Sequence, residues 1–209
     1  MSELSGRRVL VTGGAGFVGS HLVDSLASAN DVTVLDDCST GDAASLPDDV
    51  ALVEADVADP DALARATPED GVVFHCAART SVERSVSDPV ATHETNCEGS
   101  LRVLEAARRA DARVVLSSSA AVYGDPESLP VHETDSKRPR SPYGIQKLSA
   151  DHLARAYHDL HGLETVALRY FNVYGPRQRA DDYAGVIAAF RRHARAGDPS
   201  IVHCDGRHT

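Results

Sequence analysis

A glycine-rich turn between two regular segments is the feature that most constrains how this chain can fold. The stretch VLVTGGAGFVG carries Gly13, Gly16 and Gly19 in a GxxGxxG pattern. It joins a predicted strand, Arg7–Thr12, to a predicted helix, Phe17–Ala29. The first glycine permits a tight turn, the second lets backbone N–H groups approach a pyrophosphate, and the third permits close helix–strand packing. With the positive end of the helix dipole beside it, the turn predicts a dinucleotide-binding site.

Short apolar segments alternate with longer amphipathic segments along the rest of the chain. The further predicted strands are Asp31–Asp36, Val50–Glu54, Gly71–Cys76, Arg113–Ser117, Glu164–Tyr170 and Ser200–His203. The further predicted helices are Pro60–Ala66, Asp88–Ala110 (beginning at Pro89), Pro142–His161 and Tyr183–Ala196. This alternation predicts an α/β fold: a Rossmann-type, doubly wound parallel sheet with helices on both faces and the default strand order 3-2-1-4-5-6. The long loop Gly124–Ser141 follows a strand end, where functional loops of such folds lie.

Composition excludes several classes of protein. The 209 residues are 42% hydrophobic and 25% charged, which is typical of a globular chain with one large domain, or one domain and part of another. A net charge of −10 argues against nucleic acid as the main partner. No apolar segment approaches the ~20 residues that cross a bilayer, and the polar first residues indicate no signal peptide. Four cysteines without CxxC spacing indicate reduced thiols in a cytoplasmic protein and no metal site.

Acidic residues follow the second and third predicted strands. Asp36 ends the second strand, where a carboxylate accepts hydrogen bonds from an adenosine ribose, and it would repel a 2′-phosphate, so NAD is favoured over NADP. Asp37 either shares this role or is an exposed turn residue. Asp56 is placed to bind the adenine amino group, with Val57 against the ring. Alternatively, Asp56 is the N-cap of the short helix that follows.

Tyr143 and Lys147 form a YxxxK pair at the start of a long predicted helix. A spacing of four places both side chains on one face. Tyrosine is a poor base at its usual pKa of ~10, but a nearby ammonium typically lowers that pKa by ~1–3 units. A phenolate tuned in this way can take a hydroxyl proton as a hydride leaves the same carbon. The pattern alone also fits an ordinary solvated helix face, although Lys147 is one of only two lysines in the chain.

A run of three serines ends the fifth predicted strand, at the carboxyl edge of the sheet where ligands bind. Its last member, Ser119, is placed to hydrogen-bond a reacting oxygen and order the proton transfer. The alternative is a strand end with small, satisfied hydroxyls. Together with the YxxxK pair, the serine run predicts a catalytic group of Ser119, Tyr143 and Lys147.

Several sequence motifs occur along the chain in the same order as in a known protein family. They are TGGAGFVGSHLV, LDDCSTG, ADV, HCAA, TNCEGS, SSSAAVYG, SPYGIQK and RYFNVYGPRQ. The chain resembles the extended short-chain dehydrogenase/reductase family, in its NAD-dependent nucleotide-sugar epimerase/dehydratase branch. The resemblance implies NAD as cofactor and cofactor contacts at Gly13, Gly16, Phe17, Val18, Asp36, Asp56, Val57, Ala77, Asn96, Tyr143, Lys147 and Tyr170. It also implies that Asn172, and more weakly Arg177, contacts the diphosphate of a nucleotide sugar.

The residues after Ser119 narrow the reaction that the resemblance implies. The 4,6-dehydratases and decarboxylases of the family carry acidic residues there, whereas this chain has Ala120 and Ala121. The resemblance therefore implies a 4-epimerase that acts through a transient 4-keto sugar, on UDP-glucose and UDP-galactose or their N-acetyl forms. Another dehydratase or reductase of the family, or an inactive NAD-binding fragment, is the alternative.

The resemblance also implies a domain plan and an assembly. Residues 1–175 would form the NAD-binding domain with the catalytic residues. Residues 176–209 would begin a substrate-binding region that looks incomplete, because family members continue further. The two long helices, Asp88–Ala110 and Pro142–His161, correspond to the pair through which family members form homodimers.

Overall fold

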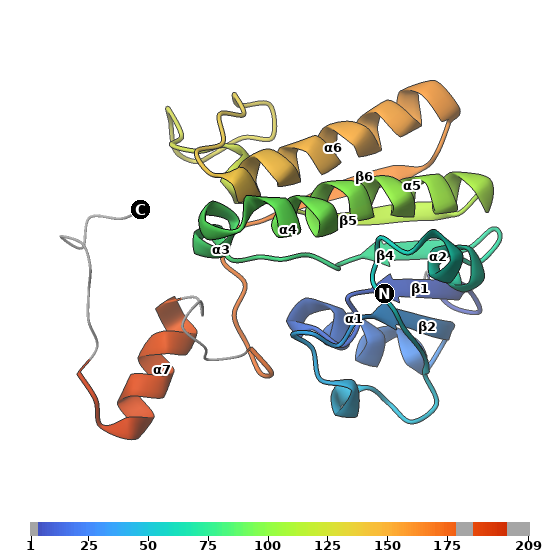
Figure 1. Cartoon of the computed structure of the whole chain (residues 1–209), viewed down its shortest axis with the longest axis horizontal. Coiled ribbons are helices and arrows are strands. Elements are labelled where there is room, and N and C mark those ends of the chain that lie inside the picture. Colours follow the sequence, from blue (N-terminus) through green and yellow to red (C-terminus); the bar gives the residue numbers. More distant parts are fainter. Residues whose placement is uncertain (1–3, 179–185, 200–209) are drawn as a thin grey trace. The chain divides into compact units, whose positions relative to one another are not determined.

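The computed structural model describes residues 4–178 and 186–199 (Figure 1). Contacts between residues divide the chain into two compact units, residues 1–171 and 172–209. The first unit contains the whole sheet, and the second contains one described helix. The resemblance places the boundary between the NAD-binding domain and the substrate-binding region at residue 175. This functional boundary stays a prediction.

Six parallel strands form one sheet in the order β3-β2-β1-β4-β5-β6, as the alternating pattern predicts. Their bounds are Arg8–Thr12 (β1), Asp31–Asp36 (β2), Ala51–Glu54 (β3), Val72–His75 (β4), Arg113–Ser119 (β5) and Thr165–Tyr170 (β6). Because every strand runs the same way, all carboxyl ends meet at one edge of the sheet. The serine run forms the end of β5, two residues beyond the predicted end of the strand, because Ser117, Ser118 and Ser119 pair with the last three residues of β6.

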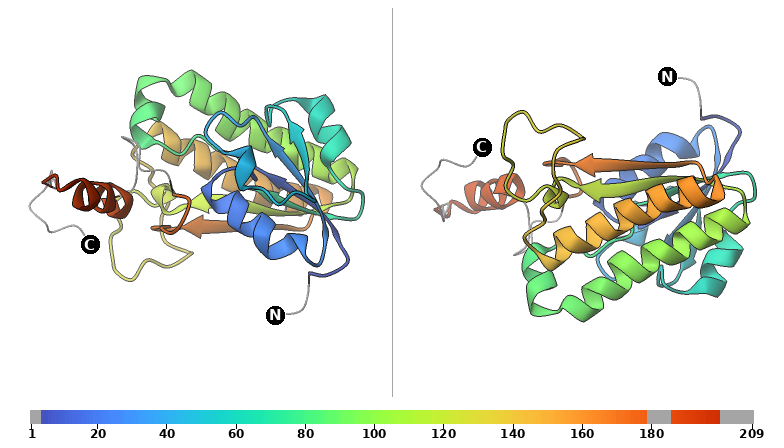
Figure 2. Two further views of the ribbon diagram at one scale, coloured as in Figure 1. Left: turned by 90° about the horizontal axis from the view of Figure 1, so that it is seen from below. Right: turned by 90° about the horizontal axis from the view of Figure 1, so that it is seen from above.

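Side-chain alternation along β1 separates two apolar cores. Val9 and Val11 lie on one face of the sheet, in a cluster with Val23 of α1 (Phe17–Ala27). Leu10 lies on the other face, in the larger cluster. That cluster is covered by α2 (Pro60–Ala66), α5 (Ser100–Arg109) and α6 (Pro142–His161), and Figure 2 shows the long helices α5 and α6 side by side over the sheet. Helices on both faces confirm the predicted doubly wound architecture.

The helix predicted over Asp88–Ala110 is interrupted in the structure. It consists of α4 (Pro89–His93), a π-helical segment η2 (Glu94–Gly99) and α5. The side chain of Asp88 caps α4, and an additional helix, α3 (Val82–Ser87), precedes it. A π-helical turn lets the chain aim a side chain that a regular helix would place differently, and such turns are frequent at functional sites.

The second unit contains α7 (Val186–Ala196). The start predicted for this helix at Tyr183 and the strand predicted at Ser200–His203 lie outside the described residues. Within the described part of the chain, no helix is long and apolar enough to cross a membrane.

Candidate active site

The glycine-rich turn has the tight geometry that its spacing predicts. Gly13 has a φ of +70°, and a Cβ there would lie 2.5 Å from the backbone nitrogen of Ala77. A Cβ on Gly19 would lie 2.1 Å from the carbonyl oxygen of Gly13. Gly16 is the N-cap of α1, which has no capping side chain and no acidic residue in its first turn. The open end of α1 therefore has backbone N–H groups and a positive dipole end that fit a pyrophosphate.

Asp36 links the end of β2 to this turn. Its Oδ2 accepts a hydrogen bond from the backbone N–H of Ala15 at 2.9 Å, and its Oδ1 accepts one from the N–H of Cys38 at 2.9 Å. A carboxylate has about four lone-pair sites, so two remain for ribose hydroxyls. Asp37 is exposed and accepts from the N–H and the hydroxyl of Ser39, which fits an exposed turn residue.

One expectation for the segment after β3 differs from the structure. Asp56 is not the N-cap of α2, because its side chain accepts from the N–H of Ala58 at 2.7 Å and Asp59 caps that helix. Val57 is buried in the larger core and packs beside Gly99, and its contact with an adenine ring stays a prediction. The close approach of η2, at a distant position in the sequence, creates this burial.

Asn96 is held by hydrogen bonds inside the protein, and the cofactor contact that the resemblance implies for it stays a prediction. It lies in η2 with 1% of its surface exposed. Its Oδ1 accepts from the N–H of Arg79 at 2.8 Å, and its Nδ2 donates to the Arg79 carbonyl at 3.0 Å and to Oε1 of Gln146 at 2.9 Å. Both amide hydrogens are thus used inside the protein. Asn96 holds the segment that follows β4, which includes Ala77, beside the glycine turn.

The structure brings Ser119, Tyr143 and Lys147 together at the carboxyl edge of the sheet. Ser141 caps α6 and Pro142 occupies its first turn, which fixes where the helix begins. Tyr143 therefore lies in the first turn, with its phenol near enough to the Ser119 hydroxyl at the end of β5 for that hydroxyl to lower its pKa. One turn later, Lys147 donates from Nζ to the carbonyl oxygen of Ser117 at 2.9 Å.

The pKa of Tyr143 is opposite in direction to the expectation. Burial raises it, and the hydrogen bond from Ser119 lowers it by less. Lys147 does not reverse this effect, because its ammonium is directed at the Ser117 carbonyl. Burial lowers the pKa of Lys147 to about 8, so this side chain still carries a proton at neutral pH.

The remaining predicted contact residues lie in both units. Phe17 and Val18 are half-buried in the first turn of α1, where Phe17 packs edge-on against His21. Tyr170 ends β6, and its burial raises its pKa. Asn172 and Arg177 belong to the second unit, and their contacts with a diphosphate stay predictions.

Sequence reasoning missed the partner of the Tyr143 backbone. The hydroxyl oxygen of Ser85, fully buried in α3, accepts from the N–H of Tyr143 at 3.1 Å. Ser81 caps α3. A serine at this position is the local sequence signal from which the additional helix α3 could have been predicted. No local signal pairs Ser85 with Tyr143, which lies far along the chain. Among the described residues, no group of three or more His, Cys, Asp or Glu side chains could hold a metal ion.

His75 is a second buried polar residue to which the sequence analysis assigned no role. Its Nε2 lies 2.9 Å from Oγ of Ser100, which donates its own hydrogen to the carbonyl of Asn96. Nε2 must therefore carry the hydrogen of a neutral ring. Nδ1 then accepts from the hydroxyl of Thr12 at 2.7 Å, and Thr12 accepts from the N–H of Ala77. In this row of hydrogen bonds around His75, every hydrogen has one acceptor. A second proton on the imidazole ring would have no acceptor.

The neutral His75 predicts a specific loss of stability in acid. Burial, and secondarily the charge of Lys147, lowers its pKa from 6.5 to about 3. The unfolded chain therefore binds one more proton than the folded chain between these values. The free energy of unfolding should fall by about 1.4 kcal/mol per pH unit in this window as pH decreases. Above pH 6.5 the contribution is constant.

Urea denaturation between about pH 3 and pH 7 measures this effect. His75→Gln should flatten the pH dependence relative to the unsubstituted protein, and the exposed His132→Gln should leave it unchanged. Equal slopes for the unsubstituted protein and the His75 variant would show that His75 titrates normally in the folded state.

Comparison with known proteins agrees with this geometry. A model described as the NAD dependent epimerase/dehydratase family matches residues 9–209. The UDP-glucose 4-epimerase of Mycolicibacterium smegmatis is 41% identical over 213 residues, covering 97% of this chain and 67% of that protein.

Two solved structures are also similar to this chain. The UDP-N-acetylglucosamine 4-epimerase from Methanobrevibacter ruminantium, in complex with UDP-N-acetylmuramic acid, has a TM-score of 0.93 at 37% identity, over 97% of this chain and 67% of that one. The UDP-glucose 4-epimerase of Thermus thermophilus in complex with NAD has a TM-score of 0.86 at 42% identity, over 92% of this chain and 64% of that one. This chain spans about two thirds of the length of these relatives. It belongs to the NAD dependent epimerase/dehydratase family, with NAD as its cofactor.

Proposed function

We propose that this chain provides the NAD-binding and catalytic part of a nucleotide-sugar 4-epimerase. Its substrates would be UDP-glucose and UDP-galactose, or their N-acetyl forms. The observation that carries the proposal is the meeting of Ser119, Tyr143 and Lys147 at the carboxyl edge of the sheet. The glycine turn at the N-terminus of α1 serves the same edge. The names of the similar proteins support the substrate class.

The cofactor would be held by the glycine turn and Asp36. The open N-terminus of α1 would take the pyrophosphate, and the free lone pairs of Asp36 would accept from the adenosine ribose. When bound, NAD supplies a hydride acceptor and donor for one sugar carbon. Lys147, Tyr143 and Tyr170 are the side chains that we assign to the nicotinamide end.

The chain's own residues would move the proton. Oη of Tyr143 takes the proton of the sugar 4-hydroxyl and later returns it to the 4-keto oxygen. The hydroxyl of Ser119, which lies near the phenol of Tyr143, would hydrogen-bond and orient the reacting oxygen. The positive charge of Lys147 favours the phenolate once Tyr143 has lost its proton. Burial raises the pKa of Tyr143, so the phenol would have to release its own proton to water before Oη can take the proton of the sugar hydroxyl.

A dehydratase is the alternative reaction within the family, and the geometry after β5 argues against it. Removal of water from a sugar needs an additional acid or base at the neighbouring carbon. The short helix η3, Ala120–Val122, directly follows Ser119 and has no ionisable side chain. Simple oxidation and reduction at one carbon needs only the three residues assigned above.

The test is to supply the purified protein with NAD and, separately, each of the four UDP-sugars. We expect interconversion within at least one pair. Tyr143→Phe should lower turnover by about 10²–10⁴-fold, because no other group at that position can take the proton, while the affinity for NAD is retained. Tyr157→Phe is the matched control on α6, since it removes only a hydrogen bond to Glu105. NAD binding without interconversion of any pair would refute the epimerase proposal.

A homodimer is a further part of the proposal. Large apolar side chains are exposed on three adjoining helices: Val86 of α3 (65%), Val90 of α4 (67%) and Ile145 of α6 (58%). Burying such a patch against a second copy would remove apolar surface from water. Sedimentation equilibrium should give twice the mass of one chain, and Val90→Glu should lower it to the mass of one. The single-chain mass for the unsubstituted protein would refute the dimer.

A further inference from the structure

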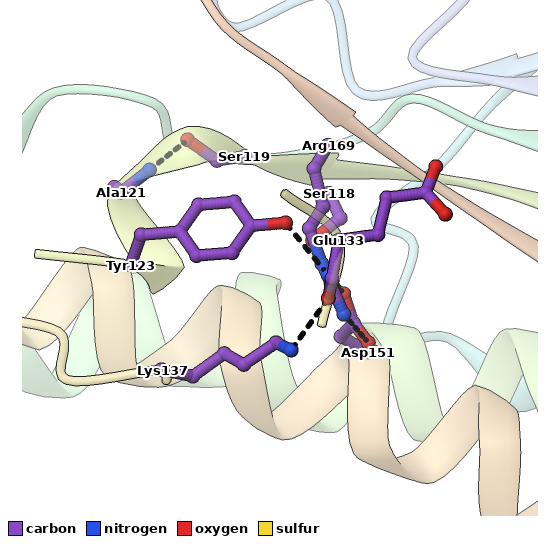
Figure 3. A network of polar contacts seen from close by, with 8 residues as sticks. All are labelled: Ser118, Ser119, Ala121, Tyr123, Glu133, Lys137, Asp151 and Arg169. Atoms are coloured by element: carbon purple, nitrogen blue, oxygen red, sulfur yellow. Dashed lines mark hydrogen bonds and ion pairs between the residues drawn. The ribbon is translucent and has the colours of Figure 1, made fainter. Parts of the chain in front are cut away.

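A buried carboxylate continues the catalytic face of α6. Asp151 lies one turn beyond Lys147, with 4% of its surface exposed. Its Oδ2 accepts from the hydroxyl of Ser118 at 3.1 Å, and Ser118 is the neighbour of Ser119 on β5 (Figure 3). The same helix face therefore carries Tyr143, Lys147 and Asp151, and each of these three side chains is tied to the end of β5.

Arg169 of β6 neutralises this carboxylate. Its Nε donates to Oδ2 of Asp151 at 2.8 Å, and one terminal nitrogen donates to Oδ1 at 3.1 Å. Such a two-point pair fixes both the distance and the angle between its partners. Although burial alone would raise the pKa of Asp151, the bonds from Arg169 and Ser118 hold it below its ordinary value. The carboxylate is thus ionised, and α6, β5 and β6 are joined through it.

The other terminal nitrogen of Arg169 reaches the long loop Gly124–Ser141. It donates to the phenol oxygen of Tyr123 at 2.8 Å and to the backbone carbonyl of Glu133 at 2.9 Å. Lys137 donates to the same carbonyl at 2.7 Å, and both cations lie over the ring of Tyr123 (Figure 3). The middle of the loop is therefore held by two positive side chains, and one of them is also bound to the catalytic helix.

We propose that Arg169 is a positioning residue: it holds the loop Gly124–Ser141 against the carboxyl edge of the sheet and keeps Tyr143 in register with Ser119. Its guanidinium bonds both α6, through Asp151, and the loop, through Glu133. The effect on the loop and the effect on Tyr143 both depend on the planar guanidinium of Arg169 and its five N–H donors. No shorter or neutral side chain reproduces this geometry. The effect on the loop stands independently of the proposed epimerase reaction, whereas the effect on turnover rests on it.

The two lysines of the chain allow a direct test of the loop. An endoproteinase that cuts after lysine can cut only after Lys137, in the loop, and Lys147, in the buried face of α6. Cutting at Lys137 reports opening of the loop, and cutting at Lys147 reports unfolding of α6. The fragments 1–137 and 1–147 differ in mass, so mass spectrometry separates the two events in one sample.

Three variants make the test specific. Arg169→Met removes the guanidinium, but leaves Asp151 buried and unpaired. Arg169→Met combined with Asp151→Leu removes the pair without leaving a buried charge, which proteins often tolerate. Arg140→Gln is the matched control, because it breaks an exposed ion pair within the same loop, between Arg140 and Asp125.

We expect the double variant to be cut at Lys137 at least about tenfold faster than the unsubstituted protein, with Lys147 still protected. Arg140→Gln should behave like the unsubstituted protein, because exposed ion pairs contribute little. Cutting of the double variant at Lys137 at the unsubstituted rate would overturn the proposal. So would equally fast cutting at Lys137 and Lys147, which would show that the pair stabilises the whole helix and not the loop.

Turnover tests the second part of the proposal. With the UDP-sugar pair that the protein interconverts, the double variant should lose at least about tenfold in kcat while its Kd for NAD changes less than about threefold. An unchanged kcat in a protein whose loop has opened would overturn the link to Tyr143. If the unsubstituted protein interconverts no pair, the epimerase proposal fails, and the cutting pattern still decides whether Arg169 holds the loop.

Discussion

One buried ammonium joins helix α6 to the sheet. Lys147, with 5% of its surface exposed, donates from α6 to the carbonyl of Ser117, an oxygen near the end of β5. A buried charge is costly unless it is hydrogen-bonded, so this contact restricts where α6 can lie on the sheet. With α6 fixed there, Tyr143 and Ser119 come within hydrogen-bond reach. The proposed chemistry depends on this contact because a proton acceptor works only at a fixed distance from its donor.

Buried polar side chains near the carboxyl edge of the sheet also hold the segments that form the site. His75 bridges Thr12 of β1 and Ser100 of α5, while Asn96 holds the backbone of Arg79. These bonds give the buried donors and acceptors partners, which is how a polar network becomes rigid. The network places the segment after β4 against the glycine turn, and Gly13 must lack a side chain because that segment is so close. The proposed phosphate-binding and proton-transfer sites therefore share one framework.

Much of the fold was predictable because its signals are local. Strand β2 (Asp31–Asp36) and helices α2 and α6 have the predicted bounds, since the strand has a clear period and both helices begin at a capped proline. The glycine turn was predictable because the GxxGxxG spacing between a strand and a helix is typical of one tight turn. The burial of Val57 and the internal hydrogen bonds of Asn96 were not predictable, because both depend on the π-helical turn η2. The pKa of Tyr143 also depends on tertiary packing: the sequence shows the spacing to Lys147, but not the depth of burial or the carbonyl that attracts the ammonium.

The most direct test of the account follows one atom through the reaction. UDP-glucose with deuterium at C4 would be converted by the purified protein, and the UDP-galactose formed would be analysed by NMR and mass spectrometry. Oxidation and reduction at a single carbon, with Tyr143 handling only the hydroxyl proton, predicts that deuterium remains at C4 and is not replaced by hydrogen from water. Loss of the deuterium to solvent, or its appearance at another carbon of the sugar, would contradict the account.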